Sequence, residues 1–361
     1  MDKNWINAIG LMSGTSLDGL DIVHCAFKYE DSAWSWKIIE AATIAYDADL
    51  ENKLASINEA DGAKLTALDL SFGSWMGEQV NKFLTDKKVQ PDLIASHGHT
   101  VFHQPGAKLT LQIGNINALY ATTGIASIGN FRILDVLKGG QGAPLVPVGD
   151  QELFGHVDFC LNLGGISNIS YADHAGLRRA FDISICNIGL NILANELNLA
   201  YDAGGEIAAK GKLDQDLFDQ LNAVPYYKQP IPKSLGKEDL DESVLQILNN
   251  SKIPVENKMT TLNRHIAIQI SSAIKLIKPK GNVMITGGGA FNQTLINNLQ
   301  QCLGSQYAII DVDKQLINYK EALIFAFLGL LRSRNAVNVL STVTGADSDS
   351  VAGDVAGRLR F

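Results

Sequence analysis

Near its start the chain reads GLMSGTSLDGLD over residues 10–21, and this stretch decides the fold. It joins two apolar stretches, Ile6–Met12 and Asp21–Phe27, and a third covers Trp34–Tyr46. Short apolar stretches separated by glycine, serine and aspartate predict strands joined by tight turns. We therefore expect the chain to open with a hairpin and a third strand, a meander.

The second half of the chain repeats this pattern. Phe159–Leu163 is apolar, Gly164–Asn168 is made of small turn residues, Ile169–Ala172 resumes the strand, and Arg179–Ile183 gives a third strand. The repeat is one of fold rather than of sequence. A hairpin with a small-residue tip is thus predicted at the start of each half.

The rest of the chain mixes helical and strand patterns. Apolar spacing predicts helices at Leu65–Leu84, Ile188–Leu197, Leu262–Ile277, from about Asn292, and at Glu321–Leu331, with strands at Leu93–Ser96 and Val283–Ile285. Residues 129–149 are rich in glycine and proline and are predicted to be a loop at a domain junction. The expected fold is α/β with two lobes, 1–145 and 146–361.

Composition excludes several classes of partner. The chain has 361 residues, is 46% apolar and carries a formal net charge of −8, which disfavours nucleic acid. No signal peptide and no apolar run of membrane-spanning length is visible, so we expect a cytoplasmic protein that does not enter the membrane. The four cysteines are scattered, as expected for buried residues in a reducing compartment.

Two turns and a glycine triplet are candidate nucleotide sites. Backbone N–H groups at small-residue turns can approach phosphate oxygens, and a carboxylate there requires Mg²⁺ between it and the phosphate. Two such turns facing each other would hold a triphosphate between the lobes, although each motif alone also fits a plain turn. The candidate ATP-binding residues are Gly14, Thr15, Ser16, Leu17, Asp18, Gly19, Leu20, Asp21, Gly164, Gly165, Asn168, Gly287, Gly288, Gly289 and Asn292. Asp18 and Asp21 are the candidate Mg²⁺ ligands, directly or through water.

Asp182 is the candidate catalytic carboxylate. It lies near the end of an apolar strand and just before a predicted helix, whose positive end would keep it ionised. An ionised carboxylate at a lobe interface can act as a general base. Capping of the helix is the alternative role.

The candidate sugar-binding residues lie in two short segments. Three histidines, His97, His99 and His103, fall within seven residues, which leaves a zinc site open, but a hydrogen-bonding role toward sugar hydroxyls suits the pattern better. Arg132 stands among apolar residues and suits a substrate carboxylate. A surface salt bridge to Asp135 is the alternative for Arg132.

Taken in order, the motifs resemble those of the anhydro-N-acetylmuramic acid kinase family. The resemblance runs from residue 9 to about residue 346. Besides residues 10–21, it is carried by Ser96-His97-Gly98, GGQGAPLVP at 139–147, NLGGISN at 162–168, Pro232-Lys233-Ser234, GGGAFN at 287–292, Glu321-Ala322 and Thr344-Gly345-Ala346.

The resemblance implies a fold and a reaction. The fold is two ribonuclease H-like lobes of the actin, Hsp70 and sugar-kinase architecture, with a cleft between them. The reaction uses ATP, Mg²⁺ and water to convert 1,6-anhydro-N-acetylmuramic acid to N-acetylmuramic acid 6-phosphate in peptidoglycan recycling. By the same resemblance Asp182 activates water and Arg132 binds the lactyl carboxylate, and a homodimer is implied. The sugar pocket is then lined by His97, Thr100 and Glu321.

Two departures from the family pattern bear on function. The family usually has Asp-Thr-Gly-Pro-Gly-Asn at its base, whereas residues 182–187 read DISICN and lack both glycines. His99 stands where the family usually has glutamine. These departures keep two alternatives open, which are a kinase for another small amino sugar and a non-catalytic, nucleotide-dependent binding module.

Overall fold

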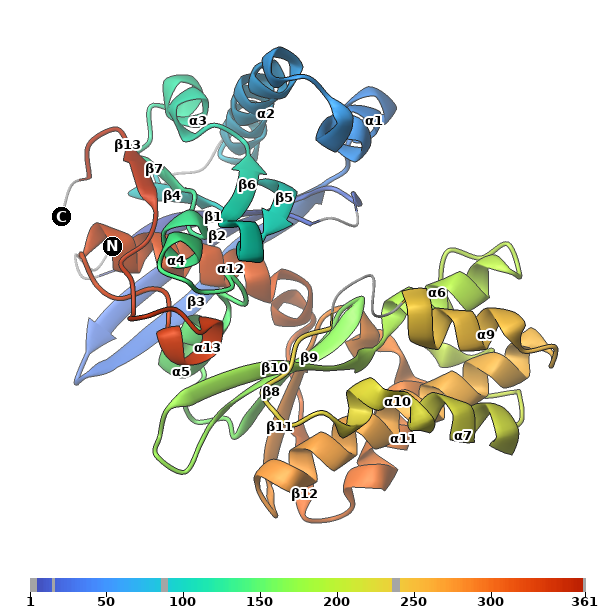
Figure 1. Cartoon of the computed structure of the whole chain (residues 1–361). Coiled ribbons are helices and arrows are strands. Elements are labelled where there is room, and N and C mark those ends of the chain that lie inside the picture. Colours follow the sequence, from blue (N-terminus) through green and yellow to red (C-terminus); the bar gives the residue numbers. More distant parts are fainter. Residues whose placement is uncertain (1–4, 15–16, 86–89, 236–240, 360–361) are drawn as a thin grey trace. The chain divides into compact units, whose positions relative to one another are not determined.

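The computed structural model describes residues 5–14, 17–85, 90–235 and 241–359 (Figure 1). The chain divides into two compact units, which are Met1–Leu153 with Tyr319–Phe361 (unit 1) and Phe154–Asn318 (unit 2). The positions of the units relative to one another are not determined, so each is described by itself. The units differ from the expected lobes 1–145 and 146–361, because the C-terminal residues belong to unit 1.

Unit 1 is built on a mixed six-stranded sheet with the order β13-β7-β4-β1-β2-β3. β1 is antiparallel to β2 and parallel to β4, and β2 is antiparallel to β3. The last strand of the chain, β13, pairs with β7, which explains why the C-terminal residues belong here. The strands are β1 (Ile6–Ser13), β2 (Leu20–Glu30), β3 (Ala33–Ile44), β4 (Leu93–Ser96), β7 (Ser127–Gly129) and β13 (Asp354–Ala356), with a separate hairpin of β5 (His99–Gln104) and β6 (Leu109–Ile113).

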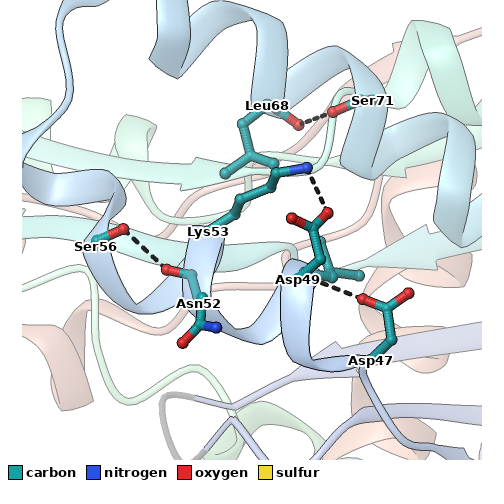
Figure 2. Close-up of polar contacts among 8 residues, drawn as sticks. Asp47, Asp49, Asn52, Lys53, Ser56, Leu68 and Ser71 are labelled. Atoms are coloured by element: carbon teal, nitrogen blue, oxygen red, sulfur yellow. Dashed lines mark hydrogen bonds and ion pairs between the residues drawn. The ribbon is translucent and has the colours of Figure 1, made fainter.

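The helices of unit 1 are fixed by caps and by close packing. The Asp47 carboxylate accepts from the N–H of Leu50 at 2.8 Å and begins α1, as Figure 2 shows beside the exposed pair of Lys53 and Asp49. A Cβ on Gly10 would lie 1.8 Å from the carbonyl oxygen of Ala322, so only glycine lets α12 approach β1 this closely. The helices are α1 (Ala48–Ser56), α2 (Gly62–Phe83), α3 (Ile116–Thr123), α4 (Ile133–Leu137), α5 (Pro147–Leu153), α12 (Lys314–Ser333), which starts in unit 2, and α13 (Ser341–Thr344).

Unit 2 repeats the strand order with different residues. Its five-stranded sheet has the order β10-β9-β8-β11-β12, in which β9 is antiparallel to both neighbours and β11 is parallel to both of its own. When the strands are numbered along each unit and the separate β5–β6 hairpin is left out, both sheets contain the order 3-2-1-4-5, which is ribonuclease H-like. The strands are β8 (Phe159–Leu163), β9 (Ile166–Ala172), β10 (Arg178–Ile185), β11 (Gly281–Thr286) and β12 (Tyr307–Ile310).

The core of unit 2 lies between its sheet and a set of helices. The long helix α10 packs against β10, α11, α6 and α7 (Figure 1). Its apolar face, with Leu262, Ile266 and Ile270 fully buried, follows the helical spacing expected from sequence. The helices are α6 (Asn187–Asn195), α7 (Gln215–Ala223), α9 (Gln246–Asn250), α10 (Val255–Ile277) and α11 (Gln293–Leu303).

Most elements agree with the sequence predictions, which confirms the α/β fold. The predicted strand Leu93–Ser96 is β4, and the predicted helix Leu65–Leu84 is α2. The predicted loop over 129–149 was partly wrong, because α4 and the start of α5 lie within it. Val136 of α4 is buried, so a short apolar segment forms a helix despite the flanking glycines. Within the described ranges, no helix combines the length and apolarity that a membrane span requires.

Candidate functional site

The turn between β1 and β2 holds the first group of predicted nucleotide residues. The N–H of Leu17 donates to the carbonyl of Gly14 at 3.4 Å, and Leu17 has a left-handed backbone with φ 60°. Gly19, with φ 148°, leads into Leu20 at the start of β2. Thr15 and Ser16 lie outside the described residues.

Carboxylates gather beside this turn. The Thr43 hydroxyl donates to Asp21 Oδ1 at 2.6 Å. Burial raises the pKa of Asp21 to about 6, the Thr43 hydrogen bond opposes this, and the negative charges of Asp18 and Glu321 add to it. Such mutual repulsion is what a bound cation would relieve, so these residues fit Mg²⁺. Within the described residues, no group of three histidine, cysteine, aspartate or glutamate side chains is arranged to hold a metal ion.

Arg132 is hydrogen-bonded to His97. Its Nε and Nη2 lie 3.0 and 2.7 Å from His97 Nε2, and its Nη1 donates to the carbonyl of Gly142 at 2.6 Å. Burial and then the Arg132 charge hold the pKa of His97 well below its ordinary value. His97 is therefore neutral, and its Nδ1 donates to the Gly98 carbonyl at 2.9 Å.

Glu321 interacts electrostatically with Arg132 in unit 1. Burial raises the pKa of Glu321, while the charge of Arg132 opposes the rise. Burial lowers the pKa of Arg132 to about 10, and Glu321 opposes that change in turn. The two predicted sugar-binding residues thus act on one another electrostatically. Thr100 follows His97 closely in the chain and lies on β5. Its hydroxyl accepts a long hydrogen bond of 3.5 Å from Gln112.

Asp135 has a different role from the surface salt bridge considered as an alternative. Its side chain is fully buried, and it accepts from the N–H of Gly142 and the hydroxyl of Thr344, both at 2.7 Å. The carbonyl of the same Gly142 accepts from Arg132. Asp135 therefore shapes the glycine-rich loop at 139–144, and this loop orients Arg132.

The three histidines have different hydrogen-bond partners. His99 Nδ1 lies 3.0 Å from Ser13 Oγ, which also accepts from the Tyr46 hydroxyl at 2.8 Å. Burial lowers the pKa of His99 and is the main cause that raises the pKa of Tyr46 to about 12. The ring of His103 instead bonds Thr110. The sequence did not single out Tyr46, since its neighbours carry no turn or motif signal.

In unit 2 the predicted base Asp182 lies on β10. Its Oδ2 accepts from the Ser234 hydroxyl at 3.1 Å and from the N–H of Leu235 at 3.0 Å. Burial raises the pKa of Asp182, and these two hydrogen bonds oppose the rise. A role as the cap of α6 is not observed, because Cys186 holds the cap position without a side-chain hydrogen bond.

The glycine turn after β8 contacts the segment that follows Asp182. Asn168 is the register partner of Asp182 on the adjacent strand and of Asn162 on the other side. Asn187, kept from the family pattern, donates from its side chain to the Leu163 carbonyl at 2.9 Å and from its backbone to the Gly164 carbonyl at 3.1 Å. The turn at Gly164 and Gly165 and the segment after Asp182 are therefore joined.

The glycine triplet approaches the same turn. Gly287 has φ +82°, and a Cβ on it would lie 2.5 Å from Asn162 Oδ1 and 2.9 Å from the Leu163 backbone. Gly289 also packs against Leu163. Asn292 has a structural partner, since its Oδ1 accepts from the N–H of Leu295 at 2.9 Å and caps α11. Unit 2 thus brings both glycine motifs together at the ends of β8 and β11, and it pairs Asn168 on β9 with Asp182 on β10.

Two ribonuclease H-like sheets, each with a glycine turn after its first strand, define the actin, Hsp70 and sugar-kinase class of fold. Within that class, the model of the anhydro-N-acetylmuramic acid kinase family matches residues 6–357. The chain belongs to this family of phosphotransferases.

Individual relatives carry the same name. Proteins named anhydro-N-acetylmuramic acid kinase are 33% identical in Saccharophagus degradans, with 96% of this chain and 98% of the relative covered, and 35% identical in Shewanella sp. ANA-3, with 96% and 97% covered. Among solved structures, component A of the (R)-2-hydroxyglutaryl-CoA dehydratase of Acidaminococcus fermentans is 13% identical, with a TM-score of 0.46 and 89% and 96% covered. The putative N-acetylmannosamine kinase Lmo2764 of Listeria monocytogenes is 14% identical, with a TM-score of 0.36 and 91% and 99% covered.

Proposed function

We propose that this protein converts 1,6-anhydro-N-acetylmuramic acid, water and ATP to N-acetylmuramic acid 6-phosphate and ADP, as a step of peptidoglycan recycling. Family membership and the names of the relatives support the substrate. The observation that carries the proposal is the state of Asp182, a carboxylate with a raised pKa and both of its side-chain hydrogen bonds on one oxygen. A carboxylate with a raised pKa is a stronger base than an ordinary one, which suits it to accept a proton from water.

In the proposed chemistry, Asp182 is the base that activates the attacking water. Asp182 takes a proton from the water while the water oxygen forms a bond to the anomeric carbon. The bond from the anomeric carbon to O6 breaks at the same time. The released O6 then forms a bond to the γ-phosphorus of ATP, and the bond to the bridging oxygen of ADP breaks. The proton held by Asp182 leaves to solvent, so the reaction yields one proton with the two products.

The phosphates are assigned to backbone N–H groups of the turns at residues 14–19 and 164–165. The adenosine is assigned to the glycine triplet at residues 287–289, where the missing side chains let a flat ring approach the backbone. Mg²⁺, held by Asp18 and Asp21 directly or through water, would neutralise charge on the phosphate oxygens. Asp21, with its pKa raised to about 6 beside Asp18 and Glu321, supports this assignment.

Arg132 is assigned to the lactyl carboxylate. A guanidinium has five N–H donors, and His97 and Gly142 take three of them. The remaining two are one on Nη1 and one on Nη2, which is the pair that can bind a carboxylate in a bidentate manner. The existing bonds orient this pair before substrate binds, which reduces the entropy lost on binding. His97, Thr100 and Glu321 are assigned to the rest of the sugar.

Product analysis in ¹⁸O-labelled water tests the reaction. We expect a sugar phosphate with label at the anomeric oxygen, formed only when both ATP and the anhydro sugar are present. Asp182→Asn should lower turnover by about 10²- to 10⁴-fold while nucleotide binding is retained. Unlabelled product would contradict the coupled reaction, and unchanged turnover in the variant would contradict the role of Asp182.

The same assay separates the alternatives. Phosphorylation of N-acetylglucosamine or another amino sugar, with none of the anhydro-muramyl sugar, would indicate a different substrate. ATP binding without any phosphorylated sugar would indicate a binding module. We also propose a homodimer in the cytoplasm, which light scattering of the purified protein and fractionation of cells would test.

A further inference from the structure

One short segment, residues 226–235, makes hydrogen bonds to both the main chain and the side chain of Asp182. The N–H of Asp182 donates to the carbonyl of Lys233 at 3.0 Å. Its carbonyl accepts from the hydroxyl of Tyr226 at 2.6 Å. Together with the bonds from Ser234 and Leu235 to Oδ2, these contacts fix the backbone and the carboxylate plane.

The two carboxylate oxygens of Asp182 are not equivalent. Oδ2 accepts two hydrogen bonds, whereas Oδ1 accepts none within the part of the chain that the structure describes. Donors that bond the ionised form withdraw charge from the oxygen they contact and make it less basic. Oδ1 is therefore the oxygen with lone pairs left for a proton.

The titratable groups around Asp182 come from the segment 226–233 and from α10. Lys233 lies with its Nζ 4.3 Å from the Tyr226 ring centroid and donates to the Tyr226 carbonyl at 2.9 Å. Tyr227 shares a hydrogen bond of 3.2 Å with Ser184, and its ring contacts His265. Burial raises the pKa of Tyr227 to about 12 and lowers the pKa of His265 to about 3, so both are neutral at neutral pH. Lys233 is the charged member of this set.

We propose that Lys233–Leu235 forms a clasp on Asp182, in which Ser234 is a positioning residue that leaves Oδ1 to receive the proton from water. The inference rests on the proposed role of Asp182 as the base. The clasp comes from a segment about fifty residues later in the chain, and it holds a base that is followed by Ile183, Ser184 and Ile185.

The Ser234→Ala variant tests the clasp through its pH profile. The Ser234 hydroxyl stabilises ionised Asp182, so its removal should raise the pKa of Asp182 and move the acidic limb of kcat/KM to higher pH by about one unit. On the acidic side, kcat/KM should fall about tenfold, because one unit corresponds to a tenfold change. Ser234→Thr keeps the hydroxyl and should restore the profile. Ser305→Ala, in an exposed turn of unit 2, is the matched control and should change nothing.

A direct titration gives a readout that does not depend on turnover. Carboxyl ¹³C NMR of the full chain, with the Asp182 signal assigned by its loss in Asp182→Asn, should show a higher pKa in Ser234→Ala than in the parent. An unmoved pKa would overturn the clasp, whether or not Asp182→Asn abolishes activity. Full activity in Asp182→Asn would instead overturn the proposed role of the base, and the titration would still decide whether Ser234 acts on Asp182.

Discussion

In unit 1 the guanidinium of Arg132 is held by His97 and by a loop shaped around the buried Asp135. In unit 2, by contrast, the carboxylate of Asp182 is held by the hydroxyl of the exposed Ser234 and by a backbone N–H. Both arrangements orient a charged group with donors or acceptors from elsewhere in the chain. They differ in burial, since Asp135 is 0% exposed and Ser234 is accessible. The unit 1 network is therefore part of the core, and its loss should lower the free energy of unfolding. Loss of the exposed unit 2 contact should mainly change the chemistry of Asp182.

Asp135→Ala should have the largest effect on stability. The substitution leaves the N–H of Gly142 and the hydroxyl of Thr344 without their buried partner, which should lower the free energy of unfolding by about 3 kcal/mol. Urea unfolding followed by fluorescence would measure it. Asp347→Ala, at an exposed position in the loop after α13, is the control. A loss as small as that of the control would show that the buried carboxylate is not needed.

Arg132→Lys should follow, with an effect on substrate use. Lysine keeps the positive charge but cannot bond His97 and Gly142 while presenting two parallel N–H groups. We expect kcat/KM for the sugar to fall by about 30-fold, or about 2 kcal/mol, mainly through KM. Steady-state kinetics would test this, with Arg179→Lys in unit 2 as the control. An unchanged KM would contradict the assignment to the lactyl carboxylate.

Tyr46→Phe should have a smaller effect in unit 1. It removes the donor to Ser13 and should lower the free energy of unfolding by about 1 kcal/mol. In the parent, Tyr46 donates to Ser13. We expect Ser13 to direct its own hydrogen to Nδ1 of His99, 3.0 Å away, which would leave the hydrogen of the ring on Nε2. Histidine ¹⁵N shifts should therefore report the Nε2–H tautomer in the parent and a mixture in the variant. Tyr29→Phe, at a half-exposed tyrosine, should leave both readouts unchanged.

Asp182→Asn should have the smallest effect on stability, and of opposite sign. The folded-state pKa of Asp182 is raised, so the ionised group destabilises the folded state once the pH rises above the ordinary pKa of 3.8. Below that pH the acid is protonated in both states and the penalty is absent. The free energy of unfolding of the variant, relative to that of the parent, should therefore increase as the pH rises from about 4 to about 8. Thermal unfolding across that range would measure it, and a gain that is greatest in acid would contradict the raised pKa.

The sequence predicted most of the secondary structure, because it depends on local patterns, whereas the roles of the candidate site residues stay predictions. The spacing of apolar residues is enough to predict α2 and α10, and the turn composition is enough to predict both hairpins. Partnerships between distant residues were not predictable. Thr344 meets Asp135 from 209 residues away, and Ser234 meets Asp182 from 52 residues away. No periodicity links such positions, since their contact depends on how the whole unit folds.

The order of the segments along the chain has a consequence for biosynthesis. Unit 2 is continuous, whereas unit 1 needs Tyr319–Phe361, and its edge strand β13 ends only at Ala356. A ribosome therefore releases every residue of unit 2 before it releases the final strand of unit 1. Nascent chains halted before residue 354 should contain a protease-resistant unit 2 beside a unit 1 that still lacks one edge of its sheet.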